Sequence, residues 1–121
     1  MIIPENSTPL GAIQQAVRDF RDARNWQQFH SPKNLSMSIA IEAAELMEHF
    51  QWLTTEQAIQ LVQIDAEAKT AITEELADVL IYCLSLADFL NCDVAEIIFD
   101  KLAKNEQKYP VDKYQGRFKQ A

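Results

Sequence analysis

Apolar residues recur every three or four positions through most of this chain, which is the spacing expected of amphipathic helices. The first such segment runs from about residue 9 to residue 24, with Thr8 as its expected N-cap. The second begins near Asn34, a good N-cap residue, and ends near Phe50. Pro32 makes it unfavourable for the first helix to continue into the second, so we expect a loop between them.

Three more helices are predicted after these two. A capping-box pattern that starts at Thr54 opens a short helix through about residue 62, and another at Asp93 opens a last helix ending near residue 109. Between them, the longest helix covers roughly residues 65–90. The sequence therefore predicts an all-α fold that resembles a four-helix bundle. The polar tail, residues 111–121, is expected to be loose or ordered only against a ligand or neighbouring subunit.

Composition and charge narrow the class of protein. The 121 residues are enough for a single domain, 1–121, with a core of about 10–110. The net charge of −7 argues against nucleic acid as a partner, because binding its phosphates needs an excess of Lys and Arg. The apolar runs are too short to span a membrane and the N-terminus does not resemble a signal peptide, so we expect a cytoplasmic protein. Cys83 lies in an apolar run and is expected to be a buried free thiol.

Acidic residues border the apolar faces of the two long helices. Glu42 and Glu45 share one edge of the second helix, and Glu75 and Asp78 share the same-handed edge of the longest one. Antiparallel packing at roughly 8–10 Å brings these four carboxylates together. Four carboxylates in one place repel one another and lose hydration, which is unfavourable unless a cation compensates their charge. Hard oxygen ligands of this kind suit Mg²⁺. The apolar faces expected to form the helix contact are Ile39, Ala43, Leu46, Met47 and Phe50 on one helix and Ile72, Leu76, Val79, Cys83 and Leu86 on the other.

Two other interpretations of these acids are open from the residues alone. The first is that they are ordinary solvated side chains, as acids on helix edges commonly are. The second is a ferritin-like di-iron site, which requires a Glu-x-x-His motif. His49 follows Glu45 by four positions rather than three, and nothing matches it on the longest helix, so the sequence disfavours the di-iron site.

The order of these motifs resembles a known family. Glu42-x-x-Glu45 followed by Glu75-x-x-Asp78 is similar to the metal-binding signature of the MazG-like all-α NTP pyrophosphatases. Over about residues 10–110 the chain resembles the dCTP pyrophosphatase branch of that family. The other segments that carry the resemblance are 24–35 (RNWQQFHSPKNL), 45–46 (EL), 50–52 (FQW), 75–82 (ELADVLIY) and 101–110 (KLAKNEQKYP).

The resemblance implies Mg²⁺-dependent hydrolysis of a nucleoside triphosphate to the monophosphate and pyrophosphate, with Mn²⁺ able to substitute. Either dCTP or a modified pyrimidine is the implied substrate, since the branch places a His in the first helix and here no His precedes His30. One of the four acids would orient or deprotonate the attacking water. By resemblance, the metal and catalytic residues are Glu42, Glu45, Glu75 and Asp78, and the substrate-binding residues are Trp26, Trp52, Tyr82, Lys101 and Asn105.

The resemblance also implies a homodimer or homotetramer in which a neighbouring subunit completes the active site. The apolar surface of the longest helix agrees with this, and Ile81 and Phe89 lie off its main apolar face as candidates for the interface. The alternative function is that of a non-catalytic helical partner, a nucleotide-binding or regulatory protein that has kept the fold. The presence of all four acids favours the enzyme.

Overall fold

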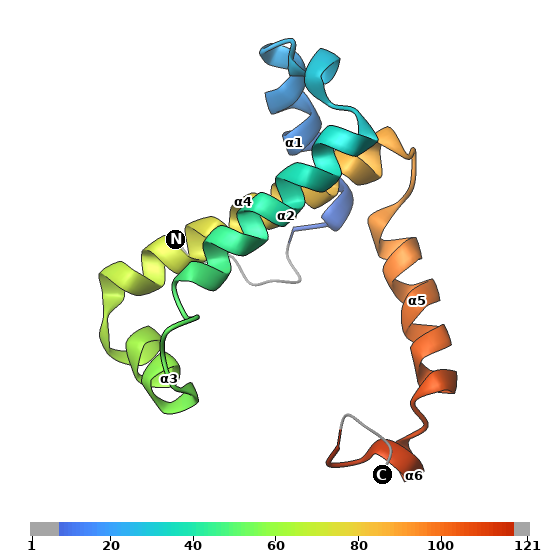
Figure 1. Cartoon of the computed structure of the whole chain (residues 1–121). Helices are drawn as coiled ribbons and strands as arrows, with labels where there is room; N and C mark the ends of the chain where they lie inside the picture. Colours follow the sequence, from blue (N-terminus) through green and yellow to red (C-terminus); the bar gives the residue numbers. More distant parts are fainter. Residues whose placement is uncertain (1–7, 118–121) are drawn as a thin grey trace.

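The protein is an assembly of helices around one central antiparallel pair (Figure 1). The computed structural model describes residues 8–117, and every regular element in that stretch is helical, which confirms the predicted all-α fold. None of these helices is long and apolar enough to cross a membrane. The elements are α1 (Leu10–Ala23), the 3₁₀ turn η2 (Trp26–Phe29), α2 (Pro32–Glu48), α3 (Thr55–Ile64), α4 (Ala66–Phe89), α5 (Val94–Lys108) and α6 (Val111–Tyr114).

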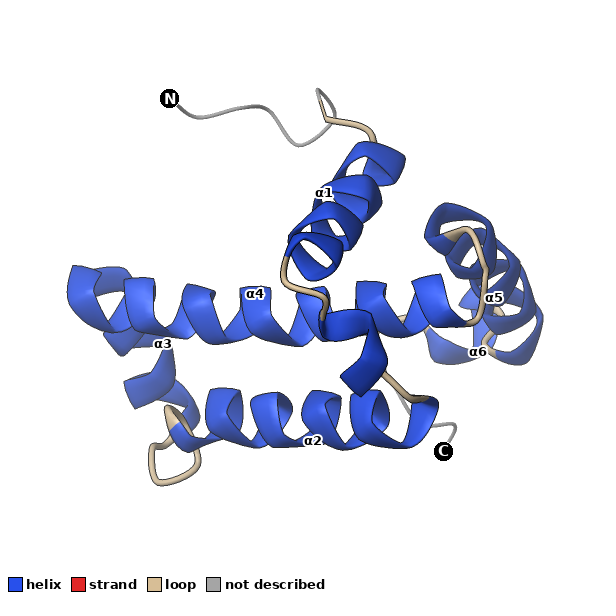
Figure 2. Ribbon diagram, turned by 90° about the horizontal axis from the view of Figure 1, so that it is seen from above, coloured by secondary structure: helices blue, strands red, loops and turns tan. Residues whose placement is uncertain are grey.

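The central pair consists of α2 and α4, which lie side by side and run in opposite directions (Figures 1 and 2). Leu35 on α2 is 1% exposed, and Ile72 and Ala87 on α4 are also buried. Burying a leucine or isoleucine side chain contributes roughly 1.5–3 kcal/mol, so these residues anchor the pair. Helix α3 packs on α4 at the end of the pair where α4 begins (Figure 1).

Helix α1 is fixed against α4 by ion pairs. Arg18 Nε donates to Asp88 Oδ1 at 2.7 Å, and Arg21 donates to the other oxygen of the same carboxylate. After Asn91, which has a left-handed backbone with φ of 52°, the chain turns away from the pair. Asparagine tolerates this conformation better than most residues. Helix α5 therefore leaves the central pair and has its main helix contact with α1 (Figures 1 and 2).

The observed helix starts correct two predictions. Ser31, not Asn34, caps α2: its Oγ accepts from the Asn34 backbone N–H at 3.1 Å, and Pro32 occupies the first helical position. Helix α1 is preceded by Pro9, and neither Pro9 nor Thr8 makes a side-chain cap. The capping box at Thr54 is confirmed in both directions.

At the start of α5, only half of the predicted capping box forms. Asp93 accepts from the Glu96 backbone N–H at 3.0 Å, with no reciprocal bond from the Glu96 side chain. The expected loop before α2 contains η2, and residues 111–114 of the tail form α6, so those parts are more regular than predicted. Residues 118–121 of the tail lie outside the described part of the chain.

The predicted apolar contact between the two long helices is only partly correct. Ile72 is buried, but Met47 is 54% exposed, Leu76 is 45% exposed and Cys83 is exposed rather than buried. The contact is rotated toward the acidic edge, because α4 is apolar on more than one side and a single α2 can cover only one of them.

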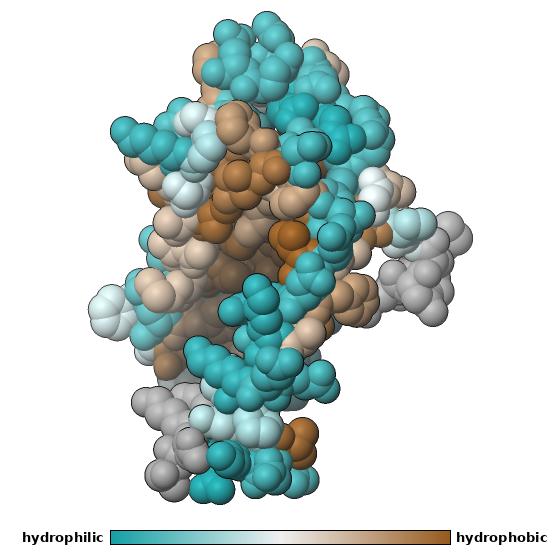
Figure 3. All heavy atoms as spheres, turned by 90° about the vertical axis from the view of Figure 1, so that its right-hand side faces the viewer, coloured by the Kyte–Doolittle hydropathy of each residue, from teal (hydrophilic) through white to brown (hydrophobic). Residues whose placement is uncertain are grey.

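Much apolar surface is left open in the single chain. Leu80 of α4 is 53% exposed, and Phe99 and Leu102 of α5 are also exposed. The face of the molecule seen in Figure 3 has apolar side chains gathered in a central hollow bordered by polar ones. Isolated exposed apolar residues are common, but a continuous patch of them usually marks an interaction surface.

Candidate metal centre and binding cavity

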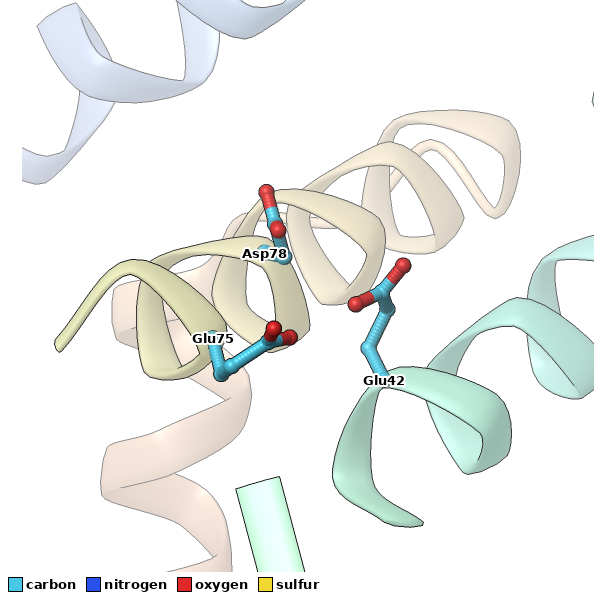
Figure 4. A group of neighbouring side chains, drawn as sticks. All are labelled: Glu42, Glu75 and Asp78. Carbon is cyan, nitrogen blue, oxygen red and sulfur yellow. The ribbon is translucent and has the colours of Figure 1, made fainter. Parts of the chain in front are cut away.

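The antiparallel contact of α2 and α4 places acids from both helices against one another. Glu42 extends from α2 toward Glu75 and Asp78, which lie one turn apart on α4 (Figure 4). One carboxylate oxygen from each of these three residues lies within 4.8 Å of the other two. The structure therefore brings together three of the four acids predicted to hold a metal.

Glu45, the fourth predicted ligand, is exposed and lies beside this group rather than within it. It is close enough to Glu42 and Glu75 to affect the ionisation of both carboxyl groups. One turn of helix separates it from Glu42, so a change of side-chain rotamer is the smallest movement that would add it to the cluster.

Burial and crowding both oppose the ionisation of these acids. Partial desolvation, followed by the hydrogen bond and the charge of Glu45, raises the pKa of Glu42 from 4.5 to about 7. The pKa of Glu75 is raised as well, first by desolvation and then by Glu45. Carboxylates that share a small space cannot all be charged without a cost in free energy, unless a cation is present.

The unpaired oxygens of the cluster fit a divalent cation. Oε2 of Glu42 and Oε2 of Glu75 are both shielded from solvent and have no hydrogen-bond partner. Buried polar atoms normally have a hydrogen-bond partner. Two carboxylate oxygens without one, close to a third carboxylate, therefore indicate a site for a cation. An all-oxygen donor set is the kind that Mg²⁺ and Mn²⁺ prefer.

A cavity of about 270 Å³ opens next to Asp78. Trp26 and Tyr82, both predicted to bind substrate, line it, and Trp26 makes an edge-to-face contact with Phe20 at 5.7 Å between ring centroids. An aromatic wall with a few polar groups, beside a carboxylate cluster, is typical of a site for a small polar ring compound.

Several residues of this cavity were not singled out from the sequence as substrate-binding. Phe20, Arg21 and Ser85 line it, and so does His30. His30 belongs to the 24–35 segment that carries the family resemblance, and this was the one available signal for it. Arg21 and Phe20 lie on α1, whose crossing of α4 depends on tertiary contacts that a helical pattern does not reveal.

The remaining predicted substrate residues lie away from this cavity in the single chain. Trp52 is 86% exposed in the turn between α2 and α3. Lys101 is exposed and Asn105 half-buried on α5, which leaves the central pair (Figure 1). Their predicted contact with substrate stays a prediction.

Comparisons with known proteins identify the family of this chain. A model of the MazG-like family matches residues 37–121. The chain is 37% identical to dCTP pyrophosphatase 1 of Mus musculus over 108 residues, and 36% identical to that of Homo sapiens over 101 residues. These matches cover 88% and 84% of this chain, but 62% and 59% of the relatives. The chain thus spans about three-fifths of the length of the curated relatives it matches.

A solved structure gives the same result at the level of the fold. The crystal structure of a pyrophosphatase from Archaeoglobus fulgidus has a TM-score of 0.76 with this chain at 38% identity. The match covers 90% of this chain and 99% of that one. The resemblance noted from the motifs is therefore confirmed: this chain belongs to the MazG-like family.

Proposed function

We propose that this protein is an Mg²⁺-dependent pyrophosphohydrolase that converts a nucleoside triphosphate to the monophosphate and pyrophosphate. The observation that carries the proposal is the group formed by Glu42, Glu75 and Asp78, two of which have shielded, unpaired oxygens. The names of the relatives, dCTP pyrophosphatases and a pyrophosphatase, support the same reaction.

In this proposal Glu42, Glu75 and Asp78 hold the metal, and Glu45 joins them by a change of rotamer. Mg²⁺, when bound, neutralises charge on the phosphate oxygens and lowers the pKa of water. One of the four carboxylates positions the attacking water, and the cavity next to Asp78 receives the base. A deoxynucleotide with a pyrimidine base, dCTP or a modified form of it, is the proposed substrate, in keeping with a role in clearing the nucleotide pool.

We also infer that the chain works as a homodimer or homotetramer. Trp52 and Lys101 are expected to contact the nucleotide, yet neither lines the cavity in one chain. A second copy could supply them and would cover exposed apolar side chains such as Leu80. Nucleic acid and membranes are not proposed as partners, and a cytoplasmic location stays a prediction.

The test is pyrophosphate release from a panel of dNTPs with and without Mg²⁺. Glu75→Gln should abolish turnover, because it removes a metal ligand. Glu74→Gln is the matched control, since Glu74 is the preceding residue, is exposed and lies outside the cluster. Well-folded wild-type protein that hydrolyses no triphosphate would reject the enzyme and favour the non-catalytic nucleotide-binding alternative.

A further inference from the structure

The walls of the cavity next to Asp78 include one face of α1 and one face of α4. From α1 it is lined by Val17, Phe20 and Arg21, whose spacing places them on the same side of that helix. Asp78 and Ser85 are among the residues that line it from α4. The shape of the cavity therefore depends on how α1 is held against α4.

Apolar packing contributes little to the attachment of α1. All of its residues are described by the structure, and none of them is buried. Its Phe20 is 50% exposed, whereas α2 and α4 bury Leu35 and Ile72. Burial of apolar side chains is the usual source of helix packing. The position of α1 must therefore depend more than usual on its polar contacts.

Those polar contacts meet at a single carboxylate. Within residues 8–117, the side-chain hydrogen bonds that join α1 to α4 all end on Asp88. Arg18 Nε donates to Oδ1 at 2.7 Å, and Arg21 Nη1 donates to Oδ2. The side chains of Arg21 and Asp88 are 14% and 20% exposed, so water screens their interaction only in part. Because the two arginines lie one turn apart, together they fix both the position and the rotation of α1.

The place of Asp88 in its own helix points to the same role. It stands in the last turn of α4, where an acidic side chain is unfavourable because the carbonyl end of a helix is partly negative. Arg21 stands in the last turn of α1, where a positive charge is favourable. Pairing with α1 thus compensates for a residue type that α4 alone would disfavour. Asp88 lies one turn beyond Ser85 but is not among the residues that line the cavity.

We propose that Asp88 is a positioning residue, which holds α1 against α4 through Arg18 and Arg21 and so keeps the cavity formed for a nucleotide. The choice of a nucleotide rests on the function proposed above. Asp88 acts through α1 and does not contact the ligand. Its loss changes the fraction of time for which the cavity is formed, and the affinity of such a site falls in proportion to that fraction.

The kinetic test uses variants at position 88 and one matched control. Asp88→Asn keeps the size of the side chain and should raise KM for dCTP about fivefold, as for a cavity formed about a fifth of the time. Saturating substrate restores the formed state, so kcat should change by less than twofold. Asp88→Glu keeps the carboxylate and should restore most of the affinity. Asp22→Asn removes another partner of Arg21, one within α1 itself, and should leave KM unchanged.

A purely structural role gives a different result. With each variant assayed well below its Tm, an aspartate that only stabilises the fold would lower Tm in Asp88→Asn and leave KM unchanged. That pattern would overturn the proposal. If Asp88→Asn does not fold, Arg18→Gln takes its place, since Arg18 is 35% exposed and does not line the cavity. It removes one of the two contacts and should raise KM about twofold; an unchanged KM would overturn the proposal equally.

Amide hydrogen exchange tests the attachment of α1 without any nucleotide. In Asp88→Asn the amides of α1 should exchange several-fold faster than in the wild type, while those in the middle of α2 and α4 should not change. Asp22→Asn should match the wild type in α1. Faster exchange in Asp88→Asn together with an unchanged KM would also overturn the proposal, since α1 would then not shape the site.

Binding of dCMP, measured by calorimetry without metal, keeps this inference distinct from the enzyme proposal. If the wild type hydrolyses no triphosphate but binds dCMP more tightly than Asp88→Asn does, the enzyme proposal fails and the role of Asp88 holds. Equal dCMP affinity and equal KM in wild type and Asp88→Asn would refute the role of Asp88 alone. A wild type that neither binds dCMP nor hydrolyses dCTP would refute both.

Discussion

Removing one negative charge from the acidic cluster should stabilise the metal-free protein while destroying its response to Mg²⁺. Glu42→Gln keeps the size of the side chain and removes its charge. Between pH 4.5 and about 7 the folded state holds a proton on Glu42 that the unfolded state has released. The free energy of unfolding therefore falls as pH rises through this window. At pH 8 Glu42 is ionised in both states, and its charge destabilises the folded state to the full extent.

The pKa shift of Glu42, from 4.5 to about 7, sets the magnitude. At about 1.4 kcal/mol per pH unit, the upper limit is about 3.5 kcal/mol. Water around this partly exposed cluster screens the interaction, so we expect about a third of that, ~1 kcal/mol. For a domain of this size, such a gain raises Tm by about 4 °C.

The assay is thermal unfolding at pH 8, in EDTA and in Mg²⁺. In EDTA, Glu42→Gln should unfold at a higher temperature than the wild type. Saturating Mg²⁺ should raise the Tm of the wild type, because it binds the folded state, and leave the variant unchanged. Glu74→Gln should behave like the wild type in both conditions. A variant less stable than wild type in EDTA, or equally stabilised by Mg²⁺, would refute the argument.

Three further predictions follow from other contacts. Burial would raise the pKa of Asp88, but hydrogen bonds and charges from Arg21 and Arg18 outweigh it and lower the pKa. The ion pairs of Asp88 therefore stabilise the folded state fully above about pH 4. Asp88→Asn should therefore lower the free energy of unfolding by about 1 kcal/mol at pH 7, measured in urea, and by less as pH falls below 4. Asn25→Ala should lower the free energy of unfolding by about 1 kcal/mol in the same assay, because Asn25 has φ of 54°, a conformation that alanine disfavours. Asn25→Gly should not lower it, because glycine adopts this conformation readily. Lys101→Ala should raise KM for dNTPs without lowering Tm, because the residue is exposed; an unchanged KM would remove it from the proposed site.

The order and type of the long helices could be predicted from the sequence because apolar spacing and capping residues are local signals. The capping box at Thr54 needs only four neighbouring residues, and it forms as expected. Residue type does not distinguish Ser31 from Asn34 as the cap of α2, because both are good N-cap residues; only the backbone geometry does. The left-handed backbone conformations of Asn25 and Asn91 likewise depend on backbone geometry that residue type alone does not reveal.

For the candidate site, spacing predicted the acids but not the cavity. Glu42, Glu75 and Asp78 converge because their helices are antiparallel, which a repeated Glu-x-x-acid pattern can indicate. Placing His30 and Arg21 at the same cavity requires knowing that α1 crosses α4, and this depends on long-range ion pairs to Asp88. Such pairs leave no periodic trace in the sequence.

The position of the acidic cluster explains why the helix contact departs from the predicted apolar faces. Glu42 and Glu75 are half-buried within the α2–α4 contact, while the neighbouring Leu76 is left exposed. Stability alone would favour the reverse, because burying leucine is favourable and crowding carboxylates is not. The arrangement is favourable only if a cation compensates the acids and another surface covers the leucine. The same rotation of α4 therefore supports both the metal site and the assembly proposed for this protein.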